Sequence, residues 1–416
     1  MGSTSEAEGL VRGFSLQRLA RLSQALDALT GRGEYAGIAM LIARRGEVLY
    51  RHHAGHADIE AGRPLADDTI YRIMSMTKPV TGVALMMLHE EGLWKLDDPV
   101  ARFIPQFAGL TVATQDGGRE ALARPMLMRD LVTSTAGFSM LAPPEIPLRG
   151  LCRNVEVAEL YRTLDLHGGP LDRMVDRLAT APLAYQPGTD FEYGVTHDVQ
   201  GRVIEVISGQ SLDAFFASRI FEPLGMADTA FELDAAQVKR LAQVYAWGPD
   251  GRVTATPPAL ATATDGGRGP YPSAGGGLYS TIPDYLKFAR MLMDGGRAGD
   301  QRLLSPASVR LMTGNLLPAG VLQNFAQPLL GLGYGVGVGV VEDPARASFN
   351  GVGFGQGTYY WTGWLGSWWW NDPVNDLTVI GMTQQEGAAI AHVGLPQRGA
   401  DLRALSAALV YGALMD

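Results

Sequence analysis

The chain has 416 residues, of which 46% are hydrophobic and 19% are charged, and its formal net charge is −9. This length exceeds what one hydrophobic core usually organises, so we expect a globular protein with two packed regions and not a disordered chain. The acidic balance, without any cluster of Lys and Arg, argues against nucleic acid as a partner, because a phosphate backbone requires a basic face.

Neither membrane insertion nor export is expected from the hydropathy pattern. The long apolar runs, such as residues 83–88, fall far short of the roughly 18 to 20 residues that span a bilayer. Residues 1–9 are polar and acidic and lack the cationic start and apolar segment of a secretory signal. The single cysteine, Cys152, cannot form an internal disulfide, which fits a reducing compartment. We therefore expect a cytoplasmic protein with no membrane partner.

The first predicted elements are a helix and a hairpin. Leucines recur at helical spacing through residues 14–31 and stop at Gly31, which predicts an amphipathic helix. Residues 36–55 contain two β-prone runs on either side of Arg45 and Gly46. This pattern predicts a hairpin with glycine at its turn.

The rest of the chain divides into a helical middle and a strand-rich end. Between Ser75 and about residue 300 the strongest patterns are helical, except for a Gly- and Pro-rich stretch that predicts a long irregular connection. Strands at both ends with helices between them predict one sheet assembled from the two ends of the chain. The predicted segments are helices at 196–210 and 211–226, the connection at 247–277, strands at 334–341, 358–372 and 377–385, and a final helix at 397–415.

A serine and a lysine three residues apart, Ser75 and Lys78, precede an apolar helical run. Residues at this spacing share one face of a helix, so the two side chains can touch. Serine becomes a nucleophile when a neighbouring base takes its proton, and a lysine serves where burial and nearby cations disfavour its charge. Pro79 is tolerated only in a first turn and places the helix start close to Ser75. The spacing alone does not separate a catalytic pair from a helix cap.

The longer segment around this pair, SMTKPVTGVALMMLHEEGLWKLDDPVARFIPQF at 75–107, resembles the nucleophile segment of the serine β-lactamase and penicillin-binding-protein superfamily. It is particularly similar to the family VIII carboxylesterases, which share the class C β-lactamase fold. The resemblance implies an α/β (α+β) protein with an antiparallel sheet flanked by helices and an inserted, mainly helical domain. The sheet domain is expected from residues 14–74 and 300–416, the helical domain from 75–299, and the active site in the cleft between them.

A second motif follows at residues 186–231, which resemble the superfamily's segment around its Y-x-N or Y-S-x motif. The match puts Tyr193 in the position of the catalytic tyrosine. A phenol loses its proton near neutral pH only beside a cation, and Lys78 would provide one, so the resemblance implies that Lys78 and Tyr193 act as a coupled base. Val195 stands where the family has asparagine, which removes one side-chain amide.

A third motif matches the K-T-G triad with Trp361, Thr362 and Gly363 and resembles the W-G-G form of family VIII esterases. An indole offers an apolar face and one N–H where lysine offers a charge for a carboxylate, so substrates without a carboxylate should be preferred. The small Gly363 should let the strand approach the substrate. The backbone N–H groups of Trp364 and Ser75 are expected to form the oxyanion hole.

Two weaker matches, at 128–138 with Ser134 where histidine is common and at 273–296, extend the resemblance over most of residues 35–385. The chain has no serine with glycine at both second-nearest positions, which sets aside the G-x-S-x-G elbow of the α/β-hydrolases. The glycines of 351–357 miss the G-x-G-x-x-G spacing of a nucleotide loop.

Metal and cofactor chemistry are not expected. The histidines of the RHHAGH segment at 51–56 lack a carboxylate partner at metal-site spacing. The expected function is a serine carboxylesterase that hydrolyses short-chain, small-molecule acyl esters through an acyl-enzyme on Ser75. A β-lactamase, a D,D-peptidase-like hydrolase and an acyltransferase to a non-water acceptor remain open. A catalytically silent binding protein is disfavoured because Ser75, Lys78 and Tyr193 are all present.

Overall fold

The computed structural model describes residues 10–140, 152–166, 169–256, 272–324, 329–347, 354–388 and 399–416. Several predicted segments therefore lie wholly or partly outside the described residues: residues 1–9, residues 257–271 of the connection at 247–277, residues 351–353 of the glycine-rich stretch and residues 397–398 of the last predicted helix. Within the described part of the chain, no helix combines the length and the apolar character needed to cross a membrane.

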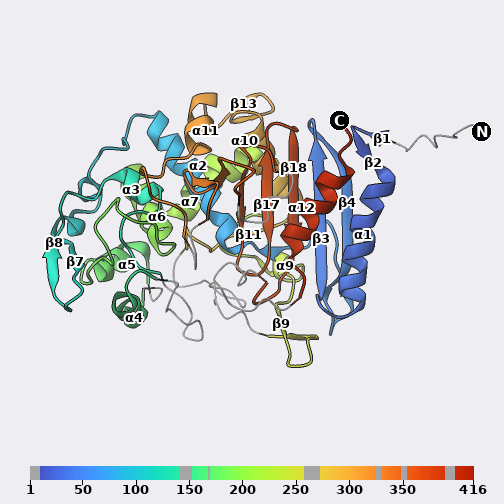
Figure 1. Cartoon of the computed structure of the whole chain (residues 1–416), viewed down its shortest axis with the longest axis horizontal. Helices are drawn as coiled ribbons and strands as arrows, with labels where there is room; N and C mark the ends of the chain where they lie inside the picture. The colour runs from blue at the N-terminus through green and yellow to red at the C-terminus, as the bar shows by residue number, and fades with distance from the viewer. Residues whose placement is uncertain are drawn as a thin grey trace, which may run out of the picture.

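An eight-stranded antiparallel sheet forms one half of the molecule and draws its strands from both ends of the chain (Figure 1). Its spatial order is β14-β15-β16-β17-β18-β3-β4-β5. The C-terminal and N-terminal parts join where β18 pairs with β3, so that Ile380 lies opposite Leu41. The strands are β3 (Gly37–Arg44), β4 (Glu47–Asp58), β5 (Arg63–Pro64), β14 (Leu332–Tyr334), β15 (Gly339–Val341), β16 (Tyr359–Thr362), β17 (Trp368–Asp372) and β18 (Leu377–Met382). The predicted fold class is confirmed.

The predicted hairpin is formed by β3 and β4, joined through Arg45 and Gly46. Both turn residues have positive φ, 51° and 83°. A two-residue turn of this kind matches the right-handed twist of the two strands, and glycine adopts it without steric cost.

Helices cover both faces of this sheet. Helix α1 (Leu16–Gly31) and helix α12 (Leu402–Ala413) pack on one face, where α1 is capped by the Ser15 hydroxyl. Phe14 and Ser15, which the leucine pattern assigned to the helix, instead form the short strand β2 (Phe14–Ser15) beside β1 (Leu10–Val11). Helix α10 (Ile282–Met293) lies on the other face. The predicted division of the chain into a sheet domain (14–74 and 300–416) and a helical domain (75–299) stays a proposal.

The three consecutive tryptophans of β17 show how one strand serves both layers. Trp368 and Trp370 enter the cluster under α1 and α12, whereas Trp369 enters the larger cluster on the opposite face. This alternation is what the pleat of a strand requires. The Trp369 ring meets the ring of Tyr285 from α10 at a centroid distance of 5.7 Å.

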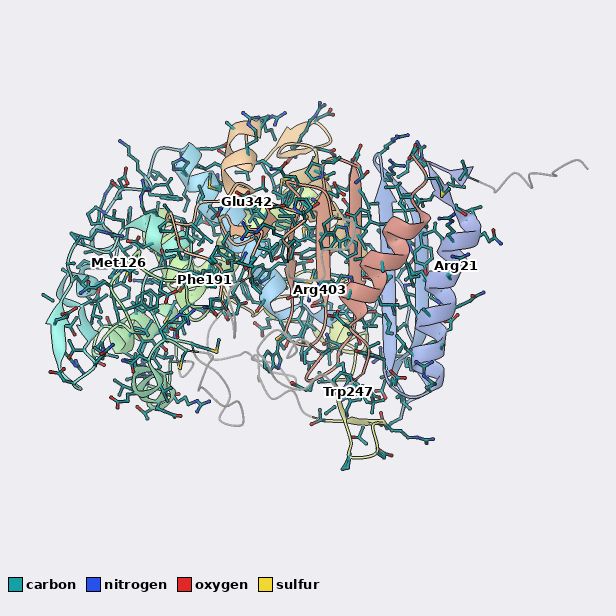
Figure 2. The ribbon with its side chains drawn as sticks, in the orientation of Figure 1. Arg21, Met126, Phe191, Trp247, Glu342 and Arg403 are labelled. Carbon is teal, nitrogen blue, oxygen red and sulfur yellow. The ribbon has the colours of Figure 1, made fainter. Side chains whose placement is uncertain are left out.

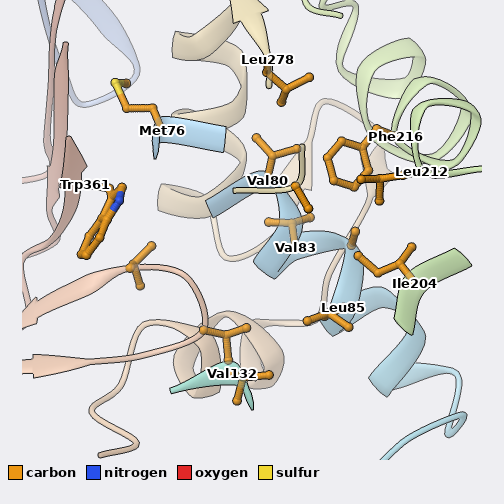
Figure 3. Packing of buried hydrophobic residues seen from close by; sticks show 14 of the residues in the cluster. Met76, Val80, Val83, Leu85, Val132, Ile204, Leu212, Phe216, Leu278 and Trp361 are labelled. Atoms are coloured by element: carbon orange, nitrogen blue, oxygen red, sulfur yellow. The ribbon is translucent and has the colours of Figure 1, made fainter. Parts of the chain in front are cut away.

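The other half of the molecule is mainly helical and surrounds α2 (Thr77–Glu90). Every residue of α2 from Thr77 to Leu88 is buried. Figure 3 shows Trp361 and Met76 near the start of α2, with Ile204, Leu212 and Phe216 around its far side. The remaining helices are α3 (Met128–Val132), α4 (Val155–Thr163), α5 (Leu171–Leu178), α6 (Thr196–Ser208), α7 (Leu212–Phe216), α8 (Glu222–Leu224), α9 (Ala235–Val238) and α11 (Pro306–Met312), with the short turns η1 (Met74–Met76), η2 (Val100–Arg102), η3 (Pro105–Gly109) and η4 (Ala217–Phe221).

Short strand pairs complete the fold. They are β6 (Tyr71–Arg72) with β11 (Tyr279–Ser280), β7 (Thr111–Ala113) with β8 (Arg119–Ala121), β9 (Tyr245–Trp247) with β10 (Val253–Ala255), and β12 (Arg297–Ala298) with β13 (Gln301–Arg302). The prediction that residues 247–277 are irregular is wrong at the start of that segment, because β9 and β10 form a hairpin. Gly251 lies in its turn with a positive φ of 78°, so a glycine interpreted as a breaker serves a hairpin turn.

Two further predicted elements are interrupted. The helix expected at 211–226 is divided by the π-helical turn η4, and Pro223 lacks the N–H that a continuous helix would need there. The strand expected at 334–341 is two strands, β14 and β15. Between them Gly337 has a φ of 77°, and a Cβ on it would lie 2.5 Å from the Lys78 carbonyl oxygen. Glycine is therefore required where this hairpin meets α2.

The stacking of α10 on the sheet predicts a large stability loss when Trp369 is truncated. Trp369→Ala should lower the free energy of unfolding by about 3–5 kcal/mol, because a buried indole is replaced by a cavity. Val374→Ala is the matched control, since Val374 is 70% exposed just beyond the same strand. Urea unfolding followed by circular dichroism measures both, and equal midpoints for the two variants would contradict this role of Trp369.

Candidate active site

The predicted nucleophile, Ser75, lies in the turn η1 immediately before α2 and is half-buried. The preceding residue, Met74, has a φ of +49°, which is unusual for a residue with a side chain and marks a sharp, strained turn. The α-helix begins at Thr77, so Pro79 falls in its first turn as predicted. Ser75 is thus displayed by a turn and is not a residue of the helix itself.

Lys78 is directed back at this serine from the first turn of α2. Its Nζ donates to Ser75 Oγ at 3.1 Å and to the carbonyl oxygen of Gly275 at 2.6 Å. The Lys78 residue is only 4% exposed. The spacing of three residues does bring the two side chains into hydrogen-bond contact, and the carbonyl of Gly275 fixes the direction of the amino group.

Tyr193 reaches the same amino group from the loop before α6. Lys78 Nζ lies 4.5 Å from the centroid of the Tyr193 ring, within the range of a cation–π contact. The Tyr193 backbone is held firmly, because the neighbouring Gly194 packs so closely that a Cβ on it would lie 2.6 Å from the Ser139 carbonyl oxygen. Val195, in the family's asparagine position, is buried and precedes α6.

The residue before Tyr193 is a buried carboxylate, Glu192. It accepts hydrogen bonds from the Ser139 hydroxyl at 2.7 Å, from the Met140 N–H at 2.7 Å and from the Arg153 N–H at 2.9 Å. Burial raises the pKa of Glu192, and these donors oppose the effect. Glu192 therefore ties the loop of Tyr193 to two other segments. Figure 2 shows its neighbour Phe191 on the helical side of the molecule.

Asp198 is a site residue that the motifs did not single out. Its Oδ1 accepts from the Ser273 hydroxyl at 2.7 Å and from the Gly275 N–H at 3.2 Å. A Cβ on Gly275 would lie 3.1 Å from Asp198 Oδ2 and 3.6 Å from Lys78 Nζ, so little more than glycine fits between them. Asp198 thereby positions the carbonyl that holds Lys78. Gly275 belongs to the segment at 273–296 that resembles the superfamily, so this segment reaches the site through the contact between the Gly275 carbonyl and Lys78.

The third motif also lies at the site. Trp361 is 5% exposed, and its ring centroid is 5.8 Å from that of Tyr193. A Cβ on Gly363 would lie 2.6 Å from the Ile73 carbonyl oxygen, so the glycine allows β16 to approach the turn that carries Ser75. The motif thus meets the nucleophile segment itself, while contact between Gly363 and substrate stays a prediction.

The predicted roles of Thr362 in substrate binding and of Trp364 in the oxyanion hole depend on this close approach of β16 to the turn of Ser75. Thr362 is half-buried at the end of β16, opposite Trp368. The Trp364 indole N–H donates to Glu386 at 2.9 Å, and this hydrogen bond anchors Trp364. The backbone N–H of Trp364 is the group predicted to form the oxyanion hole together with the Ser75 N–H. The oxyanion hole itself stays a prediction.

Two buried polar residues next to the site were also not predicted. His197 Nε2 lies 3.3 Å from the Tyr334 hydroxyl, and the Tyr334 ring meets the Trp361 ring edge-on at 5.3 Å. Burial first, and then the positive charge of Lys78, hold the pKa of His197 well below its ordinary value of 6.5. His197 follows Tyr193 by four residues, so the polar pair His197-Asp198 beside the motif was the available signal.

Other candidates lie apart from this site. Cys152 is buried, and burial together with Glu192 raises its pKa to about 11, so its thiol stays protonated near neutral pH. His52 and His53 pair with Asp27 and Asp67. Over the described ranges, no group of three or more His, Cys, Asp or Glu is arranged to hold a metal ion.

Comparison with known proteins gives the same class. The family model described as Beta-lactamase matches residues 22–402. Protein Rv1367c of Mycobacterium tuberculosis is 34% identical over 368 residues, covering 85% of this chain and 86% of that protein. Esterase EstB of Burkholderia gladioli is 32% identical over 382 residues, covering 88% and 90%. The solved structure of EstCE1, described as a hydrolase with promiscuous acyltransferase activity, superposes with a TM-score of 0.74 at 27% identity, covering 95% of this chain and 99% of that one.

The chain therefore belongs to the Beta-lactamase family and is a serine hydrolase of the β-lactamase and penicillin-binding-protein superfamily. Within that superfamily, the resemblance to the family VIII esterases that the sequence motifs indicated is confirmed.

The burial of His197 predicts a specific pH dependence of stability. Below pH 6.5 the unfolded chain protonates His197 while the folded protein, with its lowered pKa, resists the proton. The unfolded state is then favoured, so stability is complete above this pH and lost below it, by at most about 1.4 kcal/mol per pH unit. Between pH 7 and pH 5, His197→Gln should lose about 2 kcal/mol less than the wild type, measured by urea unfolding.

The control for this comparison is His56→Gln, which removes an exposed histidine of β4. It should keep the pH dependence of the wild type. Identical pH dependence for the wild type and His197→Gln would contradict the assignment of a buried, uncharged imidazole.

Proposed function

We propose that the protein is a carboxylesterase that hydrolyses short-chain acyl esters through an acyl-enzyme on Ser75. The observation that carries the proposal is the position of Lys78 Nζ, 3.1 Å from Ser75 Oγ and 4.5 Å from the centroid of the Tyr193 ring. One buried amino group thus meets a candidate nucleophile and a candidate second base. This is the arrangement that activation of a serine hydroxyl requires.

In the proposed acylation, Ser75 Oγ forms a bond to the ester carbonyl carbon and its proton passes to the Lys78–Tyr193 pair. The carbonyl electron pair moves onto oxygen, and the predicted N–H donors of Ser75 and Trp364 stabilise this oxyanion. The intermediate collapses by breaking the bond to the alcohol oxygen, and the alcohol recovers the proton from the pair. Ser75 now carries the acyl group.

Deacylation reverses the roles of the participants. A water molecule gives a proton to the Lys78–Tyr193 pair, and its oxygen attacks the acyl carbon. The bond to Ser75 Oγ breaks, Ser75 recovers the proton, and the carboxylic acid leaves. No metal or organic cofactor takes part in this scheme.

The substrate class follows from Trp361. A lysine in this position would attract a carboxylate, whereas the buried indole next to Tyr193 favours an uncharged acyl ester. This argues against β-lactam and D,D-peptide hydrolysis as the main activity. The names of the relatives EstB and EstCE1 support an ester substrate. The promiscuous acyltransferase activity described for EstCE1 keeps acyl transfer as a second outcome when an alcohol replaces water.

Removal of the proposed nucleophile tests the assignment directly. Ser75→Ala should lower kcat for p-nitrophenyl butyrate by at least about 10³-fold, because no acyl-enzyme can form. Ser218→Ala, which removes an exposed hydroxyl in η4, should retain wild-type turnover. Undiminished hydrolysis by Ser75→Ala would exclude Ser75 as the nucleophile.

A substrate panel tests the role of Trp361. The wild-type kcat/KM for p-nitrophenyl acetate or butyrate should exceed that for nitrocefin by about ten-fold or more, because nitrocefin carries a carboxylate that finds no lysine in this position. Esters of several chain lengths measured in the same buffer give the acyl preference. A ten-fold preference for nitrocefin would reverse the order of esterase and β-lactamase.

A further inference from the structure

A fully buried histidine, His197, lies close enough to Lys78 to feel its charge and has no part in the proposed acylation and deacylation. Among the described residues, the His197 side chain on α6 has one hydrogen-bond contact, from Nε2 to the Tyr334 hydroxyl at 3.3 Å. Its other ring nitrogen, Nδ1, has no partner within the described part of the chain. Burying a polar atom in this way destabilises a fold, so a histidine retained at such a position calls for a functional explanation.

The partner of His197 connects it to the catalytic groups. Tyr334 of β14 is buried, and its ring meets Trp361 at 5.3 Å and Phe191 at 5.5 Å. Trp361 in turn meets Tyr193 at 5.8 Å. Burial raises the pKa of Tyr334, and a negative charge on Tyr193 would raise it further, so the two phenols lie close enough to interact. Tyr334 therefore stays protonated when Tyr193 gives up its proton.

Burial first, and then the positive charge of Lys78, lower the pKa of His197 and favour its uncharged form. Lys78 is the cation that acts on it, and the Tyr334 hydroxyl is its hydrogen-bond partner. The buried Ser134 side chain opposes the effect of burial on the pKa of Tyr334, but its Oγ has no hydrogen-bond partner among the described residues. An uncharged imidazole adds no repulsion to the amino group of Lys78 and still fixes the Tyr334 hydroxyl.

We propose that His197 and Tyr334 are a positioning pair for the ester-hydrolysing site. His197 fixes the hydroxyl of Tyr334, the Tyr334 ring fixes Trp361, and Trp361 holds the Tyr193 ring against Lys78. The inference rests on the proposed function, because it concerns the geometry of the same base pair. Neither residue touches the reacting atoms.

Helix α6 is connected to the proposed base pair in two ways, through His197 and through its neighbour Asp198. The neighbour of His197 on α6, Asp198, binds the Gly275 N–H, and the Gly275 carbonyl binds Lys78 Nζ. Helix α6 thus determines the position of Lys78 from one side through Asp198, and the position of Tyr193 from the other side through His197. A one-residue change on α6 should therefore alter the base pair without touching it.

Four variants test the pair. Tyr334→Phe keeps the ring but removes the hydroxyl. His197→Leu removes both ring nitrogens, whereas His197→Gln keeps an amide near the position of Nε2. Tyr35→Phe is the matched control, because its buried hydroxyl bonds the Ala400 carbonyl at 2.7 Å in the cluster under α1 and α12.

Each variant is compared by its rate of reaction with a fluorophosphonate probe, with the labelled residue identified by mass spectrometry, and by kcat and KM for p-nitrophenyl butyrate per folded molecule. Tyr334→Phe and His197→Leu should lose about ten-fold in labelling rate and in kcat, with KM within about two-fold of wild type. His197→Gln should recover most of the loss, and Tyr35→Phe should match the wild type.

The outcomes separate this inference from the function beneath it. If the wild type is not labelled at Ser75, the proposed function is wrong and the positioning pair falls with it. If Ser75 is labelled but Tyr334→Phe and His197→Leu react as fast as Tyr35→Phe, only the positioning pair is wrong. A His197→Gln variant as slow as His197→Leu also overturns it. If Tyr334→Phe does not fold, the two His197 variants decide.

Discussion

The contacts of one buried amino group organise the site. Lys78 Nζ meets Ser75 Oγ, the Gly275 carbonyl and the Tyr193 ring. A lysine this deeply buried requires partners, because an unpaired ammonium or amine away from water destabilises the fold. Each partner comes from a different stretch of chain, so the three stretches are held together by the same requirement that arranges the chemistry.

The sheet and the helical half contribute to this arrangement in different ways. The helical half supplies α2 with Lys78 and α6 with Asp198, both packed in the larger hydrophobic cluster. The sheet supplies Trp361 at the end of β16, which approaches the turn of Ser75 because Gly363 has no side chain. Trp361, the residue proposed to select substrates, also contacts the ring of Tyr193 in the helical half. An exchange at Trp361 is therefore expected to affect both the proposed substrate preference and the proposed base pair.

Three glycines of the site lie where two segments of the chain come very close together. Gly337 meets the carbonyl of Lys78, Gly275 lies between Lys78 and Asp198, and Gly363 meets the carbonyl of Ile73. A methyl group at Gly337 or Gly363 would collide with backbone atoms, which cannot rotate away as a flexible side chain can. The precision of the site thus depends on close backbone contacts as much as on its polar side chains.

The sequence by itself determined the order of the main helices and strands, the α/β class and the S-x-x-K pair, because periodicity and turn residues act locally and a spacing of three closes a contact within one turn of chain. It also indicated Tyr193 and Trp361, through motifs that resemble a known superfamily. It missed the strand β2, the hairpin of β9 and β10 and the interruptions at 211–226 and 334–341. Only the tertiary structure decided that Asp198, His197 and Tyr334 belong beside Lys78. Their contacts join residues far apart in the chain, and a local signal such as the polar pair His197-Asp198 does not tell which distant groups the two side chains will meet.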